Sequence, residues 1–232
     1  MNDIFTATLV AHVAIGSVAL ILGIIPIFAS KGGTVHRRAG RWFGATMIAL
    51  IGSSAIMTMI AMKPYFAALT TAAGIAAFSG HRVLRRKRPD ISRGDRATWL
   101  DWTVTLATLF IAAWLWVLAA RGEAGQNAAV FRALIGGATG YAVYDLIRFA
   151  FPAAWPFFPR LWFYEHLVKM LGGYSAVVAA FSGSVLTFLP IPSPWKQLWP
   201  TILFHQLILG FVIFYWRWSR SRCLVRSLHT TQ

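Results

Sequence analysis

The sequence predicts an all-α protein, a polytopic bundle of about seven transmembrane helices with its N-terminus outside and its C-terminus in the cytoplasm. The first observation is composition, because 57% of the 232 residues are hydrophobic and only 12% are charged, with a mean hydropathy of +0.60. Soluble domains carry about 25% charged residues. The length suits one integral membrane domain, 1–232, without a separate soluble domain.

The second observation is the placement of the basic residues. With the N-terminus outside, 17 of the 22 Lys and Arg residues fall in inner segments and 4 in outer ones. Because cytoplasmic segments of membrane proteins carry the excess of basic residues, this bias predicts the orientation. It also accounts for the net charge of +15 without a nucleic-acid partner. The 11 tryptophans, Trp155 among them, lie near the proposed span ends, as an aromatic belt requires.

Seven apolar runs approach or exceed the roughly 20 residues that a membrane-spanning helix needs. They cover residues 4–29, 41–62, 64–84, 98–120, 128–150, 161–188 and 199–218. The first two runs flank a basic loop in which Gly32 and Gly33 predict a turn. The second and third runs meet in a tight outer hairpin at Lys63-Pro64.

The third run is rich in Ala, Gly, Ser and Thr, which favours close packing against other helices over contact with lipid. Residues 85–97 form a charged inner loop between the third and fourth runs. The proline- and aromatic-rich residues 151–160 separate the fifth and sixth runs and are expected along the inner interface. Residues 190–200 make a rigid outer connection to the last run.

Four histidines lie at two matched depths of the predicted bundle. At a rise of 1.5 Å per residue, His12 and His205 both lie roughly 10 Å from the outer surface. His81 and His166 share a level near the inner surface. Two histidine pairs at two depths are typical of a transmembrane b-type cytochrome, in which each haem b iron takes two axial imidazoles. The four histidines are therefore candidate cofactor-binding residues and haem iron ligands.

Two other interpretations of the same histidines stay open. A buried neutral histidine also bonds to a hydroxyl or carbonyl group of the next helix, and the glycines beside it, such as Gly16 and Gly23, are ordinary packing surfaces. A proton or substrate relay is the third interpretation, because ionisable side chains at membrane depth often mark a pathway.

A cluster of polar residues is predicted near the inner surface. Glu165 and Lys169 stand at i,i+4, and Asp145 and Arg148 at i,i+3, so each pair has the spacing to neutralise itself. The functional alternative is a cytoplasm-facing pocket for an anionic or quinone-like molecule. Its positive charge would come from His36, Arg37 and Lys169, and Glu165 or Asp101 would move protons. The candidate pocket residues are His36, Arg37, Asp101, Asp145, Glu165 and Lys169.

Motifs for other chemistries are missing from the sequence. The single cysteine, Cys223, excludes an internal disulfide and a cysteine-based metal site. The sequence carries no P-loop and no HExxH zinc motif. The leading interpretation is transmembrane electron transfer through haem b, with quinone as a redox partner. The alternatives are a proton-coupled small-solute carrier that uses His166, Glu165 and Lys169, and a non-catalytic membrane protein for assembly or partner binding.

Two stretches of the chain carry a resemblance. The pattern HxxxGxxALxxG runs from His12 to Gly23, and KGGxxHRxxGR runs from Lys31 to Arg41. With the later pattern HxxKM at His166, they resemble a family of uncharacterised bacterial predicted integral membrane proteins. That resemblance implies a compact multi-helix protein of the bacterial inner membrane.

The HRxxGR loop and the histidine placement are also similar to cytochrome b561-like and ferric-reductase-like bundles, which imply haem on helix histidines. The order of the helices differs from those bundles. The pairs here would join the first helix with the seventh and the third with the sixth.

Overall fold

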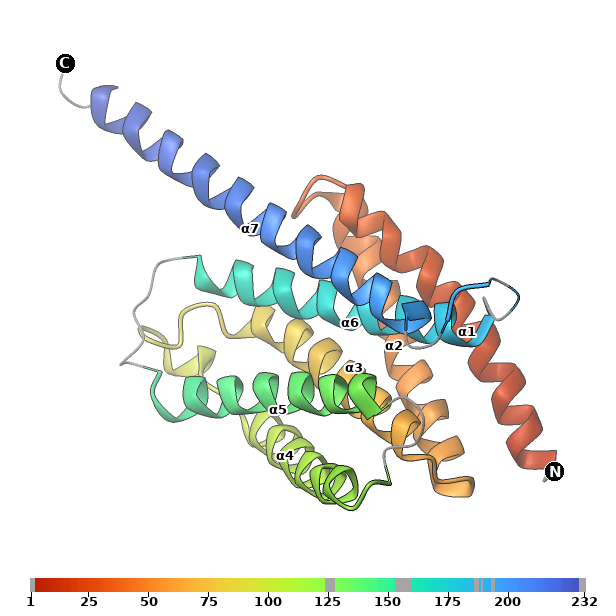
Figure 1. Ribbon diagram of the computed structural model, residues 1–232. Helices are drawn as coiled ribbons and strands as arrows, with labels where there is room; N and C mark the ends of the chain where they lie inside the picture. Colours follow the sequence, from red (N-terminus) through yellow and green to blue (C-terminus); the bar gives the residue numbers. More distant parts are fainter. Residues whose placement is uncertain are drawn as a thin grey trace.

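The computed structural model (Figure 1) describes residues 3–123, 128–152, 160–185, 188, 190–192 and 195–229, with the side chains of the last helix as far as Trp218. Its regular structure is helical throughout this part of the chain. The elements are α1 (Asp3–Phe28), α2 (Thr34–Ile60), α3 (Pro64–Arg82), the short 3-10 turns η1 (Val83–Arg85) and η2 (Arg93–Asp95), α4 (Trp99–Ala120), α5 (Ala128–Ala150), α6 (Leu161–Val185) and α7 (Trp195–His229).

In the described part of the chain each of the seven long helices overlaps one predicted run, although α2 begins earlier than predicted and α7 extends beyond its run at both ends. The all-α prediction is confirmed. Four of the described helical segments are long and apolar enough to cross a membrane: α1, α2, the segment Arg93–Ala120 that contains α4, and Trp195–Trp218 of α7. The interface prediction for residues 151–160 falls mostly outside the described residues. Trp155 and the side chain of Cys223 lie outside them as well.

Local sequence explains where several helices begin. Pro64 occupies the first turn of α3, where a residue without an N–H group is tolerated. Thr98 and Asp101 form a capping box at the start of α4, in which the Thr98 backbone N–H donates to Asp101 Oδ2 at 2.8 Å. Gly32 has a φ of 77°, a left-handed conformation that suits glycine in the turn between α1 and α2.

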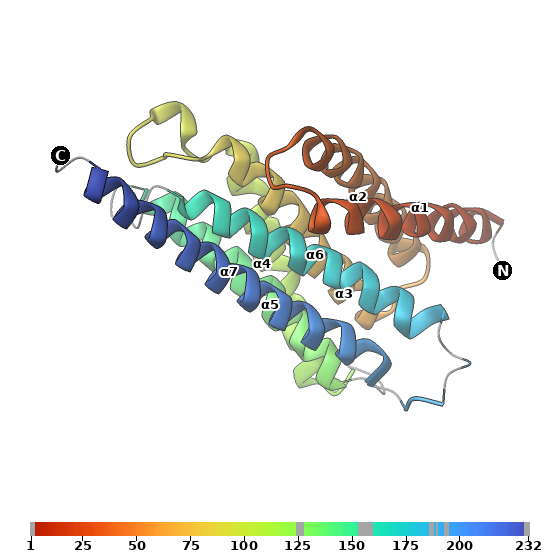
Figure 2. The ribbon, with the colours of Figure 1, turned by 90° about the horizontal axis from the view of Figure 1, so that it is seen from above.

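Helix α3 lies at the centre of the bundle and packs against α2, α4, α5 and α6. Its buried face is made of small residues, among them Ala68, Ala76 and Gly80, which confirms the prediction that it packs against other helices. Helix α1 pairs with α2, and α7 lies along α6 (Figure 2).

Three apolar clusters fill the described part of the bundle, the smallest of them around Ile75, Ala138 and Ala142. The first joins α1, α2, α6 and α7 around Phe43, Met47, Tyr174 and Phe204. The second joins α3, α4 and α5 around buried alanines, leucines and Phe131. Towards the end of the bundle that holds the α1–α2 turn, the first cluster opens into a cavity, and polar groups fill the space between α3, α5 and α6.

Candidate functional site

A cavity of about 670 Å³, here called the basic cavity, opens between the α1–α2 turn, α3, α6 and α7. Its walls come from the last turn of α1, the first turns of α2 and α6, and the end of α3, with Phe211 of α7 on one side. Segments far apart in the sequence therefore meet at one end of the bundle. The volume is that of an ordinary small-molecule site, for which roughly 300–1,000 Å³ is typical.

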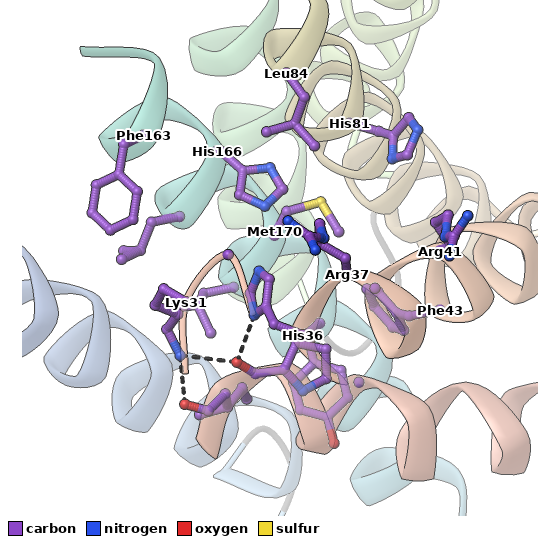
Figure 3. A pocket seen from close by; sticks show the side chains of 18 of the residues that line it. Lys31, His36, Arg37, Arg41, Phe43, His81, Leu84, Phe163, His166 and Met170 are labelled. Carbon is purple, nitrogen blue, oxygen red and sulfur yellow. Dashed lines mark hydrogen bonds between the residues drawn. The ribbon is translucent and has the colours of Figure 1, made fainter. Parts of the chain in front are cut away.

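Apart from Trp162 and Tyr174, the polar side chains that line the basic cavity are cationic or imidazole groups. Its cationic residues are Lys31, Arg37, Arg41 and Lys87, and its histidines are His36, His81 and His166. None of the described residues that line it is an aspartate or glutamate. In Figure 3 the side chains of His36 and Arg37, which belong to α2, point towards His166 and Met170, which belong to the wall formed by α6. The field inside the cavity therefore favours a negatively charged group.

The floor of the basic cavity is apolar and aromatic. Phe43 of α2 meets Tyr174 of α6 edge-on, with ring centroids 5.8 Å apart. The Tyr174 hydroxyl donates to the Leu20 backbone carbonyl at 2.7 Å, which ties α6 to α1. Gly23 makes this approach possible, because a Cβ at that position would collide with the Tyr174 ring. Leu171 adds aliphatic surface to the same floor.

Lys31 holds the turn that forms one rim of the cavity. Its Nζ donates to the backbone carbonyls of Pro26 at 2.9 Å and Ile27 at 2.6 Å, at the C-terminal end of α1, where cations are favourable (Figure 3). The same ammonium lies 5.1 Å from the centroid of the Phe211 ring. His36 Nδ1–H also donates to the Pro26 carbonyl, at 3.2 Å. Burial lowers the pKa of Lys31 below its ordinary value of 10.5.

His166 is oriented by the neighbouring helix. Its Nδ1–H donates to the Gly80 backbone carbonyl of α3 at 2.8 Å, so its Nε2 carries the free lone pair. Met170, one turn further along α6, also lines the cavity. Its Sδ would lie only 3.0 Å from a Cβ at Gly80, so α3 and α6 are in close contact here. His81 lines the same cavity from α3.

The carboxylates of the predicted pocket lie in a separate buried network. Lys169 Nζ lies 2.5 Å from Asp145 Oδ1, and Arg148 Nε lies 3.0 Å from Glu165 Oε1. The sequence spacing predicted pairs within one helix, Glu165 with Lys169 and Asp145 with Arg148. In the structure each of these residues instead pairs across the interface of α5 and α6. Tyr144 Oη also donates to Glu165 Oε1, at 2.7 Å.

Asp101 belongs to the same end of the bundle. Arg82 donates to both of its carboxylate oxygens, at 2.9 and 2.6 Å, in the bidentate geometry of a strong ion pair. This pair joins the end of α3 to the start of α4.

The predicted pocket residues thus divide into two groups on two sides of α6. His36 and Arg37 line the basic cavity with His81 and His166. Asp101, Asp145, Glu165 and Lys169 form ion pairs among α3, α4, α5 and α6 instead. The three residues expected in a proton-coupled carrier therefore do not share one surface, because Glu165 and Lys169 face α5 and His166 faces the cavity.

The other predicted pair, His12 and His205, has separate surroundings. His12 lines an apolar cavity of about 270 Å³ among α1, α2, α3 and α6, and its Nδ1 is hydrogen-bonded to Ser53 Oγ at 2.9 Å. His205 is exposed, and its Nδ1–H donates to the Thr201 carbonyl of its own helix at 2.7 Å.

Several lining residues of the basic cavity were not singled out from the sequence as binding residues. They are Arg41, Lys87, Trp162, Phe163, Met170, Tyr174 and Phe211. Lys87 lies 4.8 Å from the Trp162 ring centroid, a cation–π contact between the 85–97 loop and α6. In the sequence, basic and aromatic residues at span ends indicate topology. Their role in lining a cavity depends on which helices lie side by side, and only the fold shows that.

No protein-family model, curated protein sequence or solved structure matches this chain.

Proposed function

We propose that this protein is a multi-pass membrane protein that binds an amphiphilic anion in the basic cavity. The ligand would have a carboxylate or phosphate head and an apolar body. The observation that carries this proposal is the combination in one cavity of Lys31, Arg37 and Arg41 with an aromatic floor, and without a lining carboxylate.

The proposed membrane placement has all seven helices crossing a bacterial inner membrane, with the N-terminus outside. The basic bias of the inner segments supports it, because the α1–α2 turn and the 85–97 loop would face the cytoplasm. The cavity would then open near the inner leaflet, where an amphiphile has its head at the surface and its body in the hydrocarbon.

Both parts of the cavity contribute to selectivity. A guanidinium group binds a carboxylate or phosphate through two parallel hydrogen bonds, and the partial removal of water strengthens that contact. Phe43, Leu171 and Tyr174 supply apolar surface for the body of the ligand. A neutral analogue of the same shape would keep the apolar contacts and lose the charged ones.

A pair of probes that differ in charge tests this proposal. We expect cis-parinaric acid to bind the purified protein in a neutral detergent at least ten-fold more tightly than its methyl ester, as measured by fluorescence. Arg37→Gln should weaken binding of the acid. Arg38→Gln should not, because this substitution removes the same charge from a residue that does not line the cavity. Equal affinities of the acid and the ester would contradict the proposal.

A second candidate is haem b, which would make the protein an electron carrier that exchanges electrons with quinone. His81 and His166 line one cavity, and the Nε2 lone pair of His166 is free for a metal. These two histidines support a haem that would be held by their imidazoles, and Arg37 and Lys31 would supply positive charge for its propionates. Haem would supply one-electron chemistry, and the chain's own residues would hold and orient it.

The absorption spectrum decides between the two candidates. Protein produced with ample haem should show a Soret band that shifts on reduction with dithionite, and His166→Ala should remove it. If the spectrum stays featureless while cis-parinaric acid still binds, the haem candidate fails and amphiphile binding stands.

A further inference from the structure

Arg86 is a buried cation at the end of α3. It follows η1, and only 8% of its surface is exposed. Its guanidinium lies 4.5 Å from the centroid of the Phe149 ring of α5. Burial lowers the pKa of Arg86 from its ordinary value, because a buried charge has lost its hydration.

The neighbouring ion pairs leave Arg86 without a carboxylate of its own. Each of the three nearby carboxylates has a closer cation: Asp101 has Arg82, Asp145 has Lys169 and Glu165 has Arg148. The one carboxylate oxygen within 4 Å of Arg86 among the described residues is Asp101 Oδ1, which lies 3.7 Å from Arg86 Nε, too far for a hydrogen bond. Together with Arg82, whose side chain is 13% exposed, this group holds four cations and three carboxylates.

Two buried nitrogen atoms among the described residues lack a hydrogen-bond partner, and both belong to this group. They are Arg86 Nε and Arg148 Nη1. Arg148 is 9% exposed, so neither nitrogen can readily reach solvent. A buried N–H group without an acceptor has lost its bonds to water and gained none in return, and this loss destabilises the fold more when the group is charged.

Arg86 and Arg148 line the same small cavity. It has a volume of about 20 Å³, and its other walls include Val83, Pro89 and Phe149. A volume of at least about 10–15 Å³ accommodates one water molecule, so this cavity suits a single small particle. It is separate from the basic cavity, which shares no lining residue with it.

Charge decides between water and an ion as the occupant. Asp145 and Glu165 also line the small cavity. Ser79 and Lys169 bond to the two oxygens of Asp145, and Tyr144 and Arg148 share Glu165 Oε1, so among the described residues Glu165 Oε2 is the lining carboxylate oxygen without a hydrogen bond. The two unused donors are cationic, and the group has one positive charge in excess. We propose that this cavity binds one monovalent inorganic anion of about the size of chloride, held by Arg86 and Arg148.

The bound anion would join the end of α3 to α5 at their common boundary with α6. It would accept from both free nitrogens and neutralise the excess charge, so its removal should weaken this end of the bundle. This inference does not rest on the proposed function, because its residues lie outside the basic cavity.

The experiment is a thermal unfolding series on the purified full-length protein in a neutral detergent. Chloride is replaced stepwise by gluconate at constant ionic strength, so that general screening of charges stays the same. We expect the melting temperature to rise saturably with chloride, by about 3–6 °C when chloride reaches ten times its dissociation constant. Bromide, which is only slightly larger, should substitute for chloride.

Three variants locate the effect. Arg86→Gln should lose the chloride-dependent shift, whereas Arg85→Gln, which removes the same charge from an exposed neighbour, should keep it. Arg37→Gln should also keep it, which separates this site from the basic cavity. If Arg86→Gln does not fold, the wild-type titration alone decides. Identical melting temperatures in chloride and gluconate would overturn the proposal and leave the cavity to water.

Discussion

Lys169 Nζ and Asp145 Oδ1 lie 2.5 Å apart in the interior of the bundle, and each side chain is only 2% exposed. Ser79 of α3 closes the group, because it donates to Asp145 Oδ2 and accepts from Lys169 Nζ at 2.7 Å. Three helices thus meet at one ion pair whose charges are both satisfied. Removal of one partner should lower the free energy of unfolding, because the remaining charge would be buried without a counter-ion.

Lys169→Met should destabilise the protein by about 3–5 kcal/mol, because it leaves the Asp145 carboxylate buried without a cation. The double variant Lys169→Met with Asp145→Leu should be less destabilised than Lys169→Met alone, since it removes both charges. Chemical denaturation in detergent measures both. Losses that simply add would show that the two side chains do not depend on each other.

Gly23→Ala should destabilise the protein by about 1–3 kcal/mol, because the added methyl group displaces the Tyr174 ring. Gly16→Ala on the same helix is the control. A Cβ there would lie an ordinary 3.5 Å from Leu50 Cδ1, so this change should be neutral or stabilising. The two melting temperatures give the comparison, and equal shifts would count against the close contact of α1 with α6.

Binding of cis-parinaric acid should weaken as the pH rises, and it should do so at a lower pH than it would if Lys31 had the pKa of an ordinary lysine. The Lys31 ammonium is charged below its pKa, and burial lowers that pKa below 10.5. Its attraction for an anion is therefore present at neutral pH and is lost as the pH rises through the lowered pKa. Lys31→Arg should move the loss to higher pH in the same fluorescence titration. A profile that this substitution leaves unchanged would rule out a contribution from Lys31.

His12→Ala should cost about 1 kcal/mol, because it removes the hydrogen bond with Ser53 between α1 and α2. His205→Ala should change stability by less than about 0.5 kcal/mol, since the exposed ring bonds only within its own helix. Iron content should not change in either variant. Loss of one iron per chain from both variants would instead support a haem between these two histidines.

The helix boundaries are largely predictable from the sequence, because apolar runs and local start signals determine them together. The runs predicted at 98–120 and 128–150 correspond to α4 and α5 almost residue for residue. The run predicted from 41 begins earlier, at Thr34, because Arg37, Arg38 and Arg41 belong to the first turns of α2. Charged residues end an apolar run without ending the helix.

The candidate site is less predictable, because spacing identifies which residues share a helix face but not which helix lies opposite. Glu165 and Lys169 have the spacing of a local pair, yet each bonds to a residue of α5. The sequence predicted His36 and Arg37 in one pocket with Lys169 and three carboxylates, and of these residues only His36 and Arg37 line the basic cavity. The sequence did not indicate that Tyr174 and Phe211 would meet them, because that requires α6 and α7 to lie beside the α1–α2 turn.

The two faces of α6 have a consequence for how a ligand could enter and leave the basic cavity. His166 and Met170 line the cavity. The residues directly before them, Glu165 and Lys169, form ion pairs with α5. Turning α6 to widen the cavity would break two buried ion pairs, so that wall is fixed. The opposite wall rests on lighter contacts, such as that of Lys31 with Phe211. If the proposed ligand binds, its exchange should therefore proceed by movement of the α1–α2 turn against α7, where Lys31 meets the Phe211 ring.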